Sequence, residues 1–227
     1  MKKRKKRNRV IRFLLWLLFI FFIITFIPVL TYKFVHPIAT PIMVLRGYDK
    51  KVESAYKWVQ IEKMSSNLFR AAIAAEDYNF LEHNGFDFKA IKKAYYSNQK
   101  NTKRIKGGST ISQQTAKNVF LWPHRDYLRK GLEAWFTVLI EIVWGKKRIM
   151  EMYLNVVEFG PGIYGAEAAS LKYFGKHSSK LTPYEAASLI AVLPNPRKFR
   201  VINPSKYTLR YRQAILKRMD YVPLMKL

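Results

Sequence analysis

Carboxylates gather at one place in a chain that otherwise has few of them. Residues 76–87 hold four acidic residues and a histidine, and they follow an apolar run at 68–75. The whole chain has 15 acidic residues against 41 basic ones, so a cluster of acids indicates a site. Glu76, at the end of the apolar run, is the first candidate for acid–base chemistry. The alternative is a polar helix end, with Glu76 and Asp77 solvated and Gly85 ending a turn.

A glycine-containing basic segment is the second candidate. Residues 106–118 read KGGSTISQQTAKN, and the two glycines let the backbone approach a ligand closely. Thr110 and Gln113 have the spacing of a capping box, which predicts a helix start. A helix N-terminus flanked by Lys106 and Lys117 is typical of an anion site. An ordinary loop with a good cap is the alternative.

A second carboxylate follows a basic pair. Glu133 comes after Arg129 and Lys130 and opens an apolar run, so it is expected to meet little water. Burial disfavours the charged form of such a group, whereas nearby cations favour it. The alternative is a glutamate near a helix start that interacts with the helix dipole.

These groups need rigid elements to position them, and the pattern of apolar residues predicts mostly helices. A capping box with proline at the first helical position opens at Thr182. A break is expected near Gly145, and strand-like alternation is scarce. We therefore expect a mainly α-helical domain. The predicted helices span 68–80, 110–120, 131–143, 147–157, 182–193 and 207–219.

The N-terminal region predicts a membrane anchor. Residues 2–12 hold eight basic residues and no acid, and residues 13–32 carry no charge. A helix needs about 20 apolar residues to cross a bilayer. A cleaved signal peptide has an apolar core of only about 7–15 residues followed by small residues, but bulky side chains follow here. We expect an uncleaved single-pass anchor in the inner membrane, with the basic end cytoplasmic and the following domain on the periplasmic side.

Composition limits the remaining possibilities. The formal net charge is +26, and 33 basic against 15 acidic residues remain after residue 12. The domain should therefore bind polyanions; outside the inner membrane these are lipid head groups and lipid-linked substrates, not nucleic acid. The absence of cysteine excludes disulfides, thiolate metal sites and a cysteine nucleophile. We expect a basic tail at 1–12, an anchor at 13–32, a connector at 33–56 and the catalytic domain at 57–227.

Five ordered motifs resemble those of the peptidoglycan glycosyltransferases of family 51, and the match runs from about residue 67 to residue 204. The chain ends where a bifunctional penicillin-binding protein would continue into a transpeptidase domain, so we expect a monofunctional member. The resemblance implies a single lysozyme-like helical domain. The motifs are E-D-x-x-F-x-x-H-x-G-x-D (Glu76, Asp77, Phe80, His83, Gly85, Asp87), G-G-S-T-I-[ST]-Q-Q (Gly107 to Gln114), R-K-x-x-E (Arg129, Lys130, Glu133), Y-L-N with spaced glycines (Tyr153, Leu154, Asn155, Gly160, Gly165) and L-x-P-x-E-A-A-x-L (181–189), continuing to Arg197.

The resemblance also implies a reaction. The substrate would be lipid II, a disaccharide-peptide on undecaprenyl pyrophosphate, which is polymerised into β-1,4-linked glycan with inversion at the anomeric carbon. Glu76 would be the general base. Lys117 and Arg125, supported by Lys106 and Lys130, would neutralise the leaving pyrophosphate. Glu133 would orient those cations or a divalent metal, or assist the leaving group.

Further site residues, a cofactor and partners are implied in the same way. Mg²⁺ or Mn²⁺ would bind with the substrate pyrophosphate, and no protein ligand for it is assigned. The partners would be lipid II, the growing glycan, the membrane and other cell-wall synthesis proteins. The basic and aromatic segment 88–96 suits a membrane interface, with a solvated amphipathic helix as the alternative. The implied substrate-binding residues are Asp77, His83, Lys106, Ser109, Thr110, Gln113, Gln114, Lys117, Asn118, Arg125, Arg129, Lys130, Asn155 and Arg197.

Two other functions are considered. A membrane-anchored muramidase or lytic transglycosylase would share a helical domain and a catalytic glutamate, but it would not need Lys106, Lys117 and Arg125 for a pyrophosphate. A non-catalytic cell-wall scaffold would leave the carboxylates unexplained. Polymer formed from lipid II, as opposed to cleavage of finished sacculi, separates these functions.

Overall fold

The computed structural model describes residues 2–47, 55–100, 107–124 and 126–222, and the chain divides into two units, 1–36 and 37–227. The first unit holds one helix, α1 (Lys2–Phe34). Within its residues Asn8–Phe34 an 18-residue stretch has a mean hydropathy of 2.9, and this helix is long and apolar enough to cross a membrane. The predicted uncharged segment 13–32 lies inside this helix. A signal sequence can have the same length and composition as a membrane anchor, so these two properties fit both.

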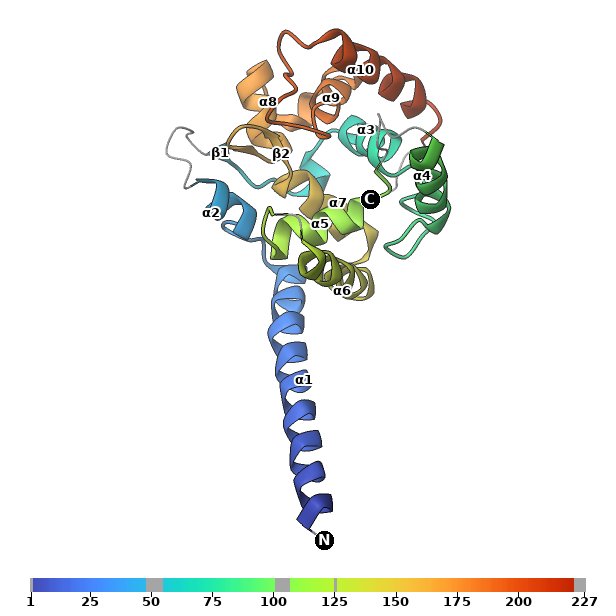
Figure 1. Ribbon diagram of the computed structural model, residues 1–227. Helices are drawn as coiled ribbons and strands as arrows, with labels where there is room; N and C mark the ends of the chain where they lie inside the picture. The colour runs from blue at the N-terminus through green and yellow to red at the C-terminus, as the bar shows by residue number, and fades with distance from the viewer. Residues whose placement is uncertain (1, 48–54, 101–106, 125, 223–227) are drawn as a thin grey trace. The chain divides into compact units, whose positions relative to one another are not determined.

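The second unit is mainly helical, as predicted (Figure 1). Three short strands form a small sheet in the order β1-β3-β2, in which β3 pairs in parallel with β1 and antiparallel with β2. The strands are β1 (Ala55–Tyr56), β2 (Glu158–Gly160) and β3 (Ile163–Tyr164). The helices are α2 (Pro41–Gly47), α3 (Ser66–Glu76), α4 (Phe88–Lys100), α5 (Ile111–Phe120), α6 (Tyr127–Val143), α7 (Gly145–Val156), α8 (Ala166–Phe174), α9 (Pro183–Ile190) and α10 (Lys206–Met219), with 3-10 turns at Ile61–Lys63 and Ser178–Lys180.

The helices pack in two groups around one core. The helix α5 packs against α6 and α7, whereas α3 packs against α9 and α10. The two groups are linked at the C-terminal end of α3, where Gln114 of α5 donates a hydrogen bond to Glu76. Leu68, Ile111, Ile140 and Ile149 are completely buried between these helices. Burying one such side chain contributes about 1.5–3 kcal/mol, so the helices that carry the site are held on a rigid frame.

Several helix starts follow the local sequence chemistry. Thr110 and Thr182 both form the predicted capping boxes, with Gln113 and Glu185 as their partners. The predicted interruption is also confirmed, because α6 ends before Gly145, which adopts a φ of +74° and begins α7.

Other helix boundaries were wrong. The helix expected to reach Phe80 ends at Glu76, because Asp77 has a φ of −159° and leaves the helical conformation. The helix predicted over 182–193 ends at Ile190. The helix predicted over 131–143 begins earlier, because the Asp126 side chain accepts a hydrogen bond from the Arg129 amide and caps it. Within the segment expected as a connector, 33–56, the structure has the short helix α2, which packs against α5.

Candidate functional site

Glu76 is the last residue of α3, and it lies against the first turns of α5. The Gln114 side-chain amide donates a hydrogen bond of 2.8 Å to Glu76 Oε2. Burial raises the pKa of Glu76, and the Gln114 hydrogen bond and the nearby Lys117 ammonium oppose this shift. A carboxylate with a raised pKa is a better proton acceptor than a solvated one. The first two sequence motifs therefore meet at a suitable general base.

Two tyrosines close the space behind Glu76. Tyr153 is completely buried, and its hydroxyl has no hydrogen-bond partner within the described residues. Burial and the Glu76 carboxylate raise the pKa of Tyr153 well above its ordinary value, so this hydroxyl stays neutral. The Tyr211 hydroxyl donates to the carbonyl of Ala75, and its pKa is raised for the same reasons. This wall keeps water from one side of Glu76.

Asp77 joins the loop after α3 to the start of α5. It is 6% exposed, and its carboxylate accepts hydrogen bonds from the Ile111 amide at 2.9 Å and from His83 Nε2 at 2.9 Å. The Gly85 amide donates to His83 Nδ1, which places the imidazole proton on Nε2. Burial raises the pKa of Asp77, and the bonds from His83 and Ile111 oppose it. Asp77 and His83 therefore position Glu76.

The rest of this loop is closed by Gly85 and Asp87. Gly85 has a φ of +90°, and a Cβ there would lie 2.8 Å from Thr137 Cγ2. Its carbonyl accepts a hydrogen bond from the Thr110 hydroxyl at 2.6 Å. Asp87 accepts from the Ala90 amide at 2.8 Å and caps α4, and this hydrogen bond lowers the pKa of Asp87. Position 85 requires glycine, because any other side chain would be strained at this φ and would clash with Thr137.

A lysine at the start of α7 holds the same loop from the other side. Lys146 Nζ donates to the carbonyl of His83 at 2.5 Å and to the Glu141 carboxylate at 2.7 Å. Glu141 also accepts a hydrogen bond of 2.5 Å from Ser112 in α5. The Lys146 ammonium lies 4.7 Å from the centre of the Phe80 ring. Three helices thus fix the loop that follows Glu76.

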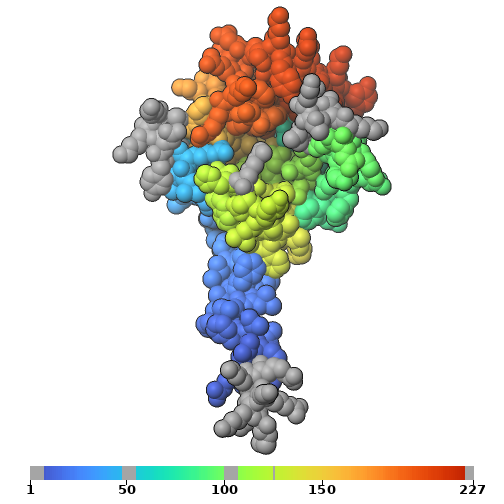
Figure 2. Space-filling view, viewed as in Figure 1, coloured from blue at the N-terminus to red at the C-terminus, as the bar shows by residue number. Residues whose placement is uncertain are grey.

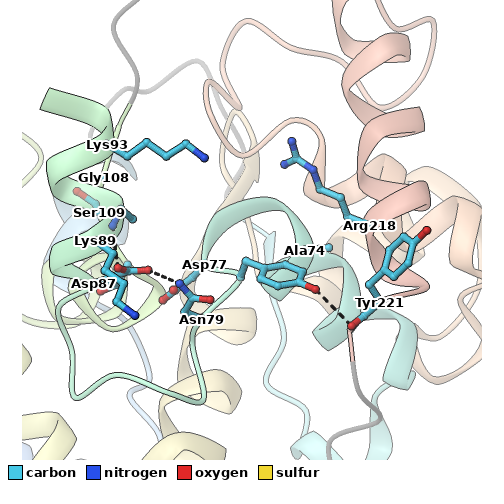
Figure 3. Close-up of a pocket in the computed structure, with 13 residues that line it drawn as sticks. Ala74, Asp77, Asn79, Asp87, Lys89, Lys93, Gly108, Ser109, Arg218 and Tyr221 are labelled. Atoms are coloured by element: carbon cyan, nitrogen blue, oxygen red, sulfur yellow. Dashed lines mark hydrogen bonds between the residues drawn. The ribbon is translucent and has the colours of Figure 1, made fainter. Parts of the chain in front are cut away.

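The first cavity, of about 660 Å³, opens on the Asp77 side of the site. Lys93 from α4 and Arg218 from α10 face one another across it, and Asp77 and Asp87 lie deeper (Figure 3). Ser109, on the glycine-containing loop, also lines this cavity. The first cavity combines basic groups at its rim with carboxylates inside, an arrangement that suits a polar, partly anionic ligand.

Two further cavities lie on the Gln114 side. The second cavity has about 390 Å³ and the third about 290 Å³, and Arg46, Gln114 and Lys117 line both. Burial lowers the pKa of Lys117, and Glu133 opposes this shift. Ser109 lines the first and the second cavity, so the glycine-containing loop separates them. Glu76 itself is in none of these three linings, but its neighbour Asp77 lines the first cavity and its hydrogen-bond partner Gln114 lines the other two.

Glu133 is a buried anion among cations. It is 3% exposed and accepts a hydrogen bond from Arg129 at 2.8 Å and another from Lys130. All three line the second cavity, together with Lys117. Both Glu133 oxygens are thus occupied by cations, and this geometry favours a role in orienting them.

Some of the other predicted substrate-binding residues line a cavity, and others make structural contacts. Lys106 and Arg125 lie outside the described residues. Asn118 and Arg197 line the third cavity, and Ser109 and Thr110 line the first. Gln113 instead caps α5. Asn155 is completely buried, and its amide bonds to the backbone of Val59 and Glu151. The geometry gives Gln113 and Asn155 structural contacts.

Arg46 and Arg218 are basic cavity residues that the sequence interpretation missed. Arg46 lies in the segment expected as a connector, where Pro41 at the start of a short helix was the available signal. Arg218 lies near the end of α10, and nothing local marks it as a cavity residue. Long-range packing brings both to the cavities.

The described residues do not provide a protein-held metal site. They contain no cluster of three or more His, Asp or Glu residues that could hold a metal ion. The Glu133 oxygens are taken by Arg129 and Lys130, and the Asp77 oxygens by His83 and Ile111. This donor set does not fit direct coordination of a divalent cation by the protein.

Comparison with known proteins identifies the family of this chain. A family model described as Transglycosylase matches residues 44–220. A biosynthetic peptidoglycan transglycosylase of Caulobacter vibrioides is 55% identical over 189 residues, covering 83% of this chain and 82% of the relative. Proteins of that description from Bdellovibrio bacteriovorus and Bacteroides thetaiotaomicron are 54% and 47% identical, covering 84% and 88% of this chain and 78% and 82% of each relative.

Proposed function

This chain belongs to the transglycosylase family, and on that premise we propose that it polymerises lipid II into peptidoglycan glycan strands with Glu76 as the general base. The observation that carries this assignment is the hydrogen bond from Gln114 to Glu76 beside Lys117. This carboxylate of raised pKa is supported as the base because it adjoins Asp77, which lines the first cavity, and Gln114, which lines the two cation-lined cavities.

Glu76 acts first, by taking the proton of the acceptor hydroxyl. An acceptor sugar in the first cavity presents its 4-hydroxyl to the carboxylate, and Glu76 takes the proton as the oxygen attacks the anomeric carbon. Gln114 fixes Oε2, which leaves Oε1 for the incoming proton. The pyrophosphate leaves from the opposite face, so the anomeric centre inverts. Separation of the base from the leaving-group site suits such a displacement.

The leaving pyrophosphate binds in the second and third cavities. Lys117, with Lys130 and the predicted contributions of Lys106 and Arg125, neutralises the charge that develops on the pyrophosphate. Glu133 holds Arg129 and Lys130 in place and opposes the effect of burial, which lowers the pKa of Lys117. Because cations stabilise this leaving group, it departs without needing a proton.

Lipid II turnover by the purified chain in detergent tests this function. We expect β-1,4-linked glycan polymer and release of undecaprenyl pyrophosphate. Cleavage of finished sacculi without polymer formation would instead assign the chain to the lytic enzymes. No turnover of either substrate by folded protein would favour a scaffold.

We also propose that a divalent cation, if it acts, binds through substrate pyrophosphate oxygens and not through a protein site. It would bind together with the pyrophosphate at the second cavity, which Glu133 and four basic side chains line. Chelation should then lower turnover in the presence of lipid II, while the unfolding temperature of the free protein stays unchanged. A large drop in that temperature on chelation would contradict this proposal.

Two features support a location at the membrane: the apolar helix and the exposed aromatic residues of α4. The apolar helix Asn8–Phe34 would anchor the chain in the inner membrane with the catalytic unit on the periplasmic side. In α4, Phe88, Tyr95 and Tyr96 are exposed between lysines, which suits contact with the head-group region. Other cell-wall synthesis proteins remain proposed partners.

A further inference from the structure

A buried carboxylate joins three distant segments at the third cavity. Glu158, in β2, is 5% exposed and accepts hydrogen bonds from Arg46 in α2 and, at 3.2 Å, from Arg197. The Gly162 amide also approaches it, at 3.4 Å. Because a single carboxylate meets two guanidinium groups, the cluster keeps a positive charge beside the cavity.

Arg46 occupies the junction of two cavities. It lines the second cavity with Lys117 and Lys130, and the third with Lys117 and Arg197. Its side chain is 30% exposed, so part of the guanidinium group is open to a ligand. An arginine has five N–H donors, and within the described residues Glu158 is the one hydrogen-bond partner of this side chain. The remaining donors can serve a ligand.

The position of Arg46 is set by packing and not by the ion pair alone. The helix α2 packs on α5, with Ile42 and Met43 buried. In Figure 2 the α2 region, in light blue, reaches the surface beside the yellow-green α5 region. Arg46 is also near enough to Lys117 to disfavour its charged form. Two cations held this close are stabilised when an anion lies between them.

We propose that Arg46 is a further substrate-binding residue, which pairs with Lys117 on the diphosphate of the lipid-linked sugar, and that Glu158 is the residue that positions it. This inference rests on the proposed function and extends it to a helix before the first sequence motif. Arginine offers two parallel N–H groups to phosphate oxygens, which a lysine cannot do. Arg46 would bind two phosphate oxygens through its parallel N–H groups, and Lys117 would add the positive charge of its ammonium.

Kinetics with lipid II test this assignment. Losing one charge-assisted contact to substrate should raise KM about tenfold in Arg46→Gln, while kcat stays within about twofold. Arg46→Lys should recover part of the loss, because it keeps the charge without the parallel N–H groups. Glu158→Gln should raise KM in the same direction, and its effect should not add to that of Arg46→Gln, since both act on one side chain.

Two controls separate binding from folding. Arg148→Gln removes another arginine that pairs with a mostly buried glutamate, Glu151, but lines neither cavity, and its KM should not change. Calorimetric binding of inorganic pyrophosphate, measured without turnover, should weaken in Arg46→Gln and not in Arg148→Gln. If Arg46→Gln does not fold, Arg46→Lys decides, and an unchanged KM and pyrophosphate affinity in that variant overturn the assignment.

The substrate can be varied to identify the anion. Lipid II without its peptide keeps the diphosphate and loses the peptide carboxylates, so the KM ratio between wild type and Arg46→Gln should persist. A ratio that vanishes with this substrate would assign Arg46 to a peptide carboxylate and overturn the proposal. Wild-type protein that makes no polymer overturns the proposed function instead, and pyrophosphate binding then still tests Arg46.

Discussion

At the scale of single residues, the site depends on the environment of Glu76. The neutral hydroxyl of Tyr153 and the packing of α3 exclude water from the carboxylate, whereas Gln114 and Lys117 stabilise its charge. Burial prevails and raises the pKa. The raised pKa makes Glu76 a better proton acceptor than a solvated carboxylate.

The pH dependence of stability should reveal this shift. The pKa of Glu76 in the folded protein lies above its ordinary value of 4.5, so the folded state holds the proton more tightly than the unfolded state. The carboxyl therefore costs no stability below pH 4.5, and the cost grows as pH rises through the folded-state pKa. The unfolding free energy of Glu76→Gln should exceed that of wild type increasingly above pH 4.5, as denaturant titrations can measure. A difference that is constant with pH would contradict the shift.

Lys117 should act on substrate more than on stability. Its ammonium is partly buried and lines the second and third cavities. We expect Lys117→Met to lower kcat/KM by roughly ten- to a hundredfold, as for the loss of one charge-assisted contact. Because the pKa of the buried ammonium is lowered, the variant should unfold at the same or a higher temperature. Lys172→Met, on an exposed position, serves as the control; equal kinetic losses in both would remove Lys117 from the site.

At the scale of elements, the loop between α3 and α4 is the structure that presents Glu76. It is held by the start of α5 through Asp77 and Thr110, and by the start of α7 through Lys146. Within the loop the Phe80 amide donates to the Asp77 carbonyl and the Glu82 amide to the Asn79 carbonyl, and the contacts to α5 and α7 tie these turns to the helices.

Gly85 should be the least replaceable residue of this loop. Gly85→Ala forces a side chain into positive φ and against Thr137, and it should cost about 1–3 kcal/mol of stability. Gly131→Ala is the matched control, because Gly131 lies in α6 and a Cβ added there would point into open space. That change should be neutral or stabilise by up to about 1 kcal/mol. Thermal unfolding of both variants measures the contrast, and equal effects would contradict the steric account.

A helix boundary can be predicted from the sequence when the residues that set it are close to one another in the chain. The starts at Thr110 and Thr182 are set by side chains three residues away, and the sequence predicts both. The end at Glu76 is set by Asp77, whose partner Ile111 is 34 residues away, and was predicted wrongly. Arg46 reaches Glu158 across 112 residues, which no local pattern reports. The five motifs identified the family and predicted Glu76 as the base, but they did not predict the helix that carries Arg46.

At the scale of the whole molecule, the chain divides into two units, and the proposed anchor and the proposed chemistry lie in different ones. Residues 1–36 supply the apolar helix, and residues 37–227 contain every cavity described above. The second unit still holds 32 basic and 15 acidic residues, so it keeps its own attraction to anionic lipid.

Removing the first unit should therefore change location more than chemistry. A chain starting at residue 37 should keep the helical circular dichroism of the catalytic unit and polymerise lipid II in detergent at a rate within about threefold of the full chain. Its binding to anionic vesicles should persist at low salt and fall at high salt. Sedimentation with vesicles measures this, and salt-insensitive binding would point to an apolar contact in place of charge.

The most direct measurement is the turnover of Glu76→Gln together with its binding of lipid II in detergent. The amide keeps the shape and can still bond to Gln114, so binding and folding should stay near wild type, whereas polymerisation should fall by roughly a hundredfold or more without the base. Glu82→Gln, at an exposed acid of the same loop, should polymerise at the wild-type rate. Near-normal polymer formation by Glu76→Gln would contradict the assignment of Glu76 as the base.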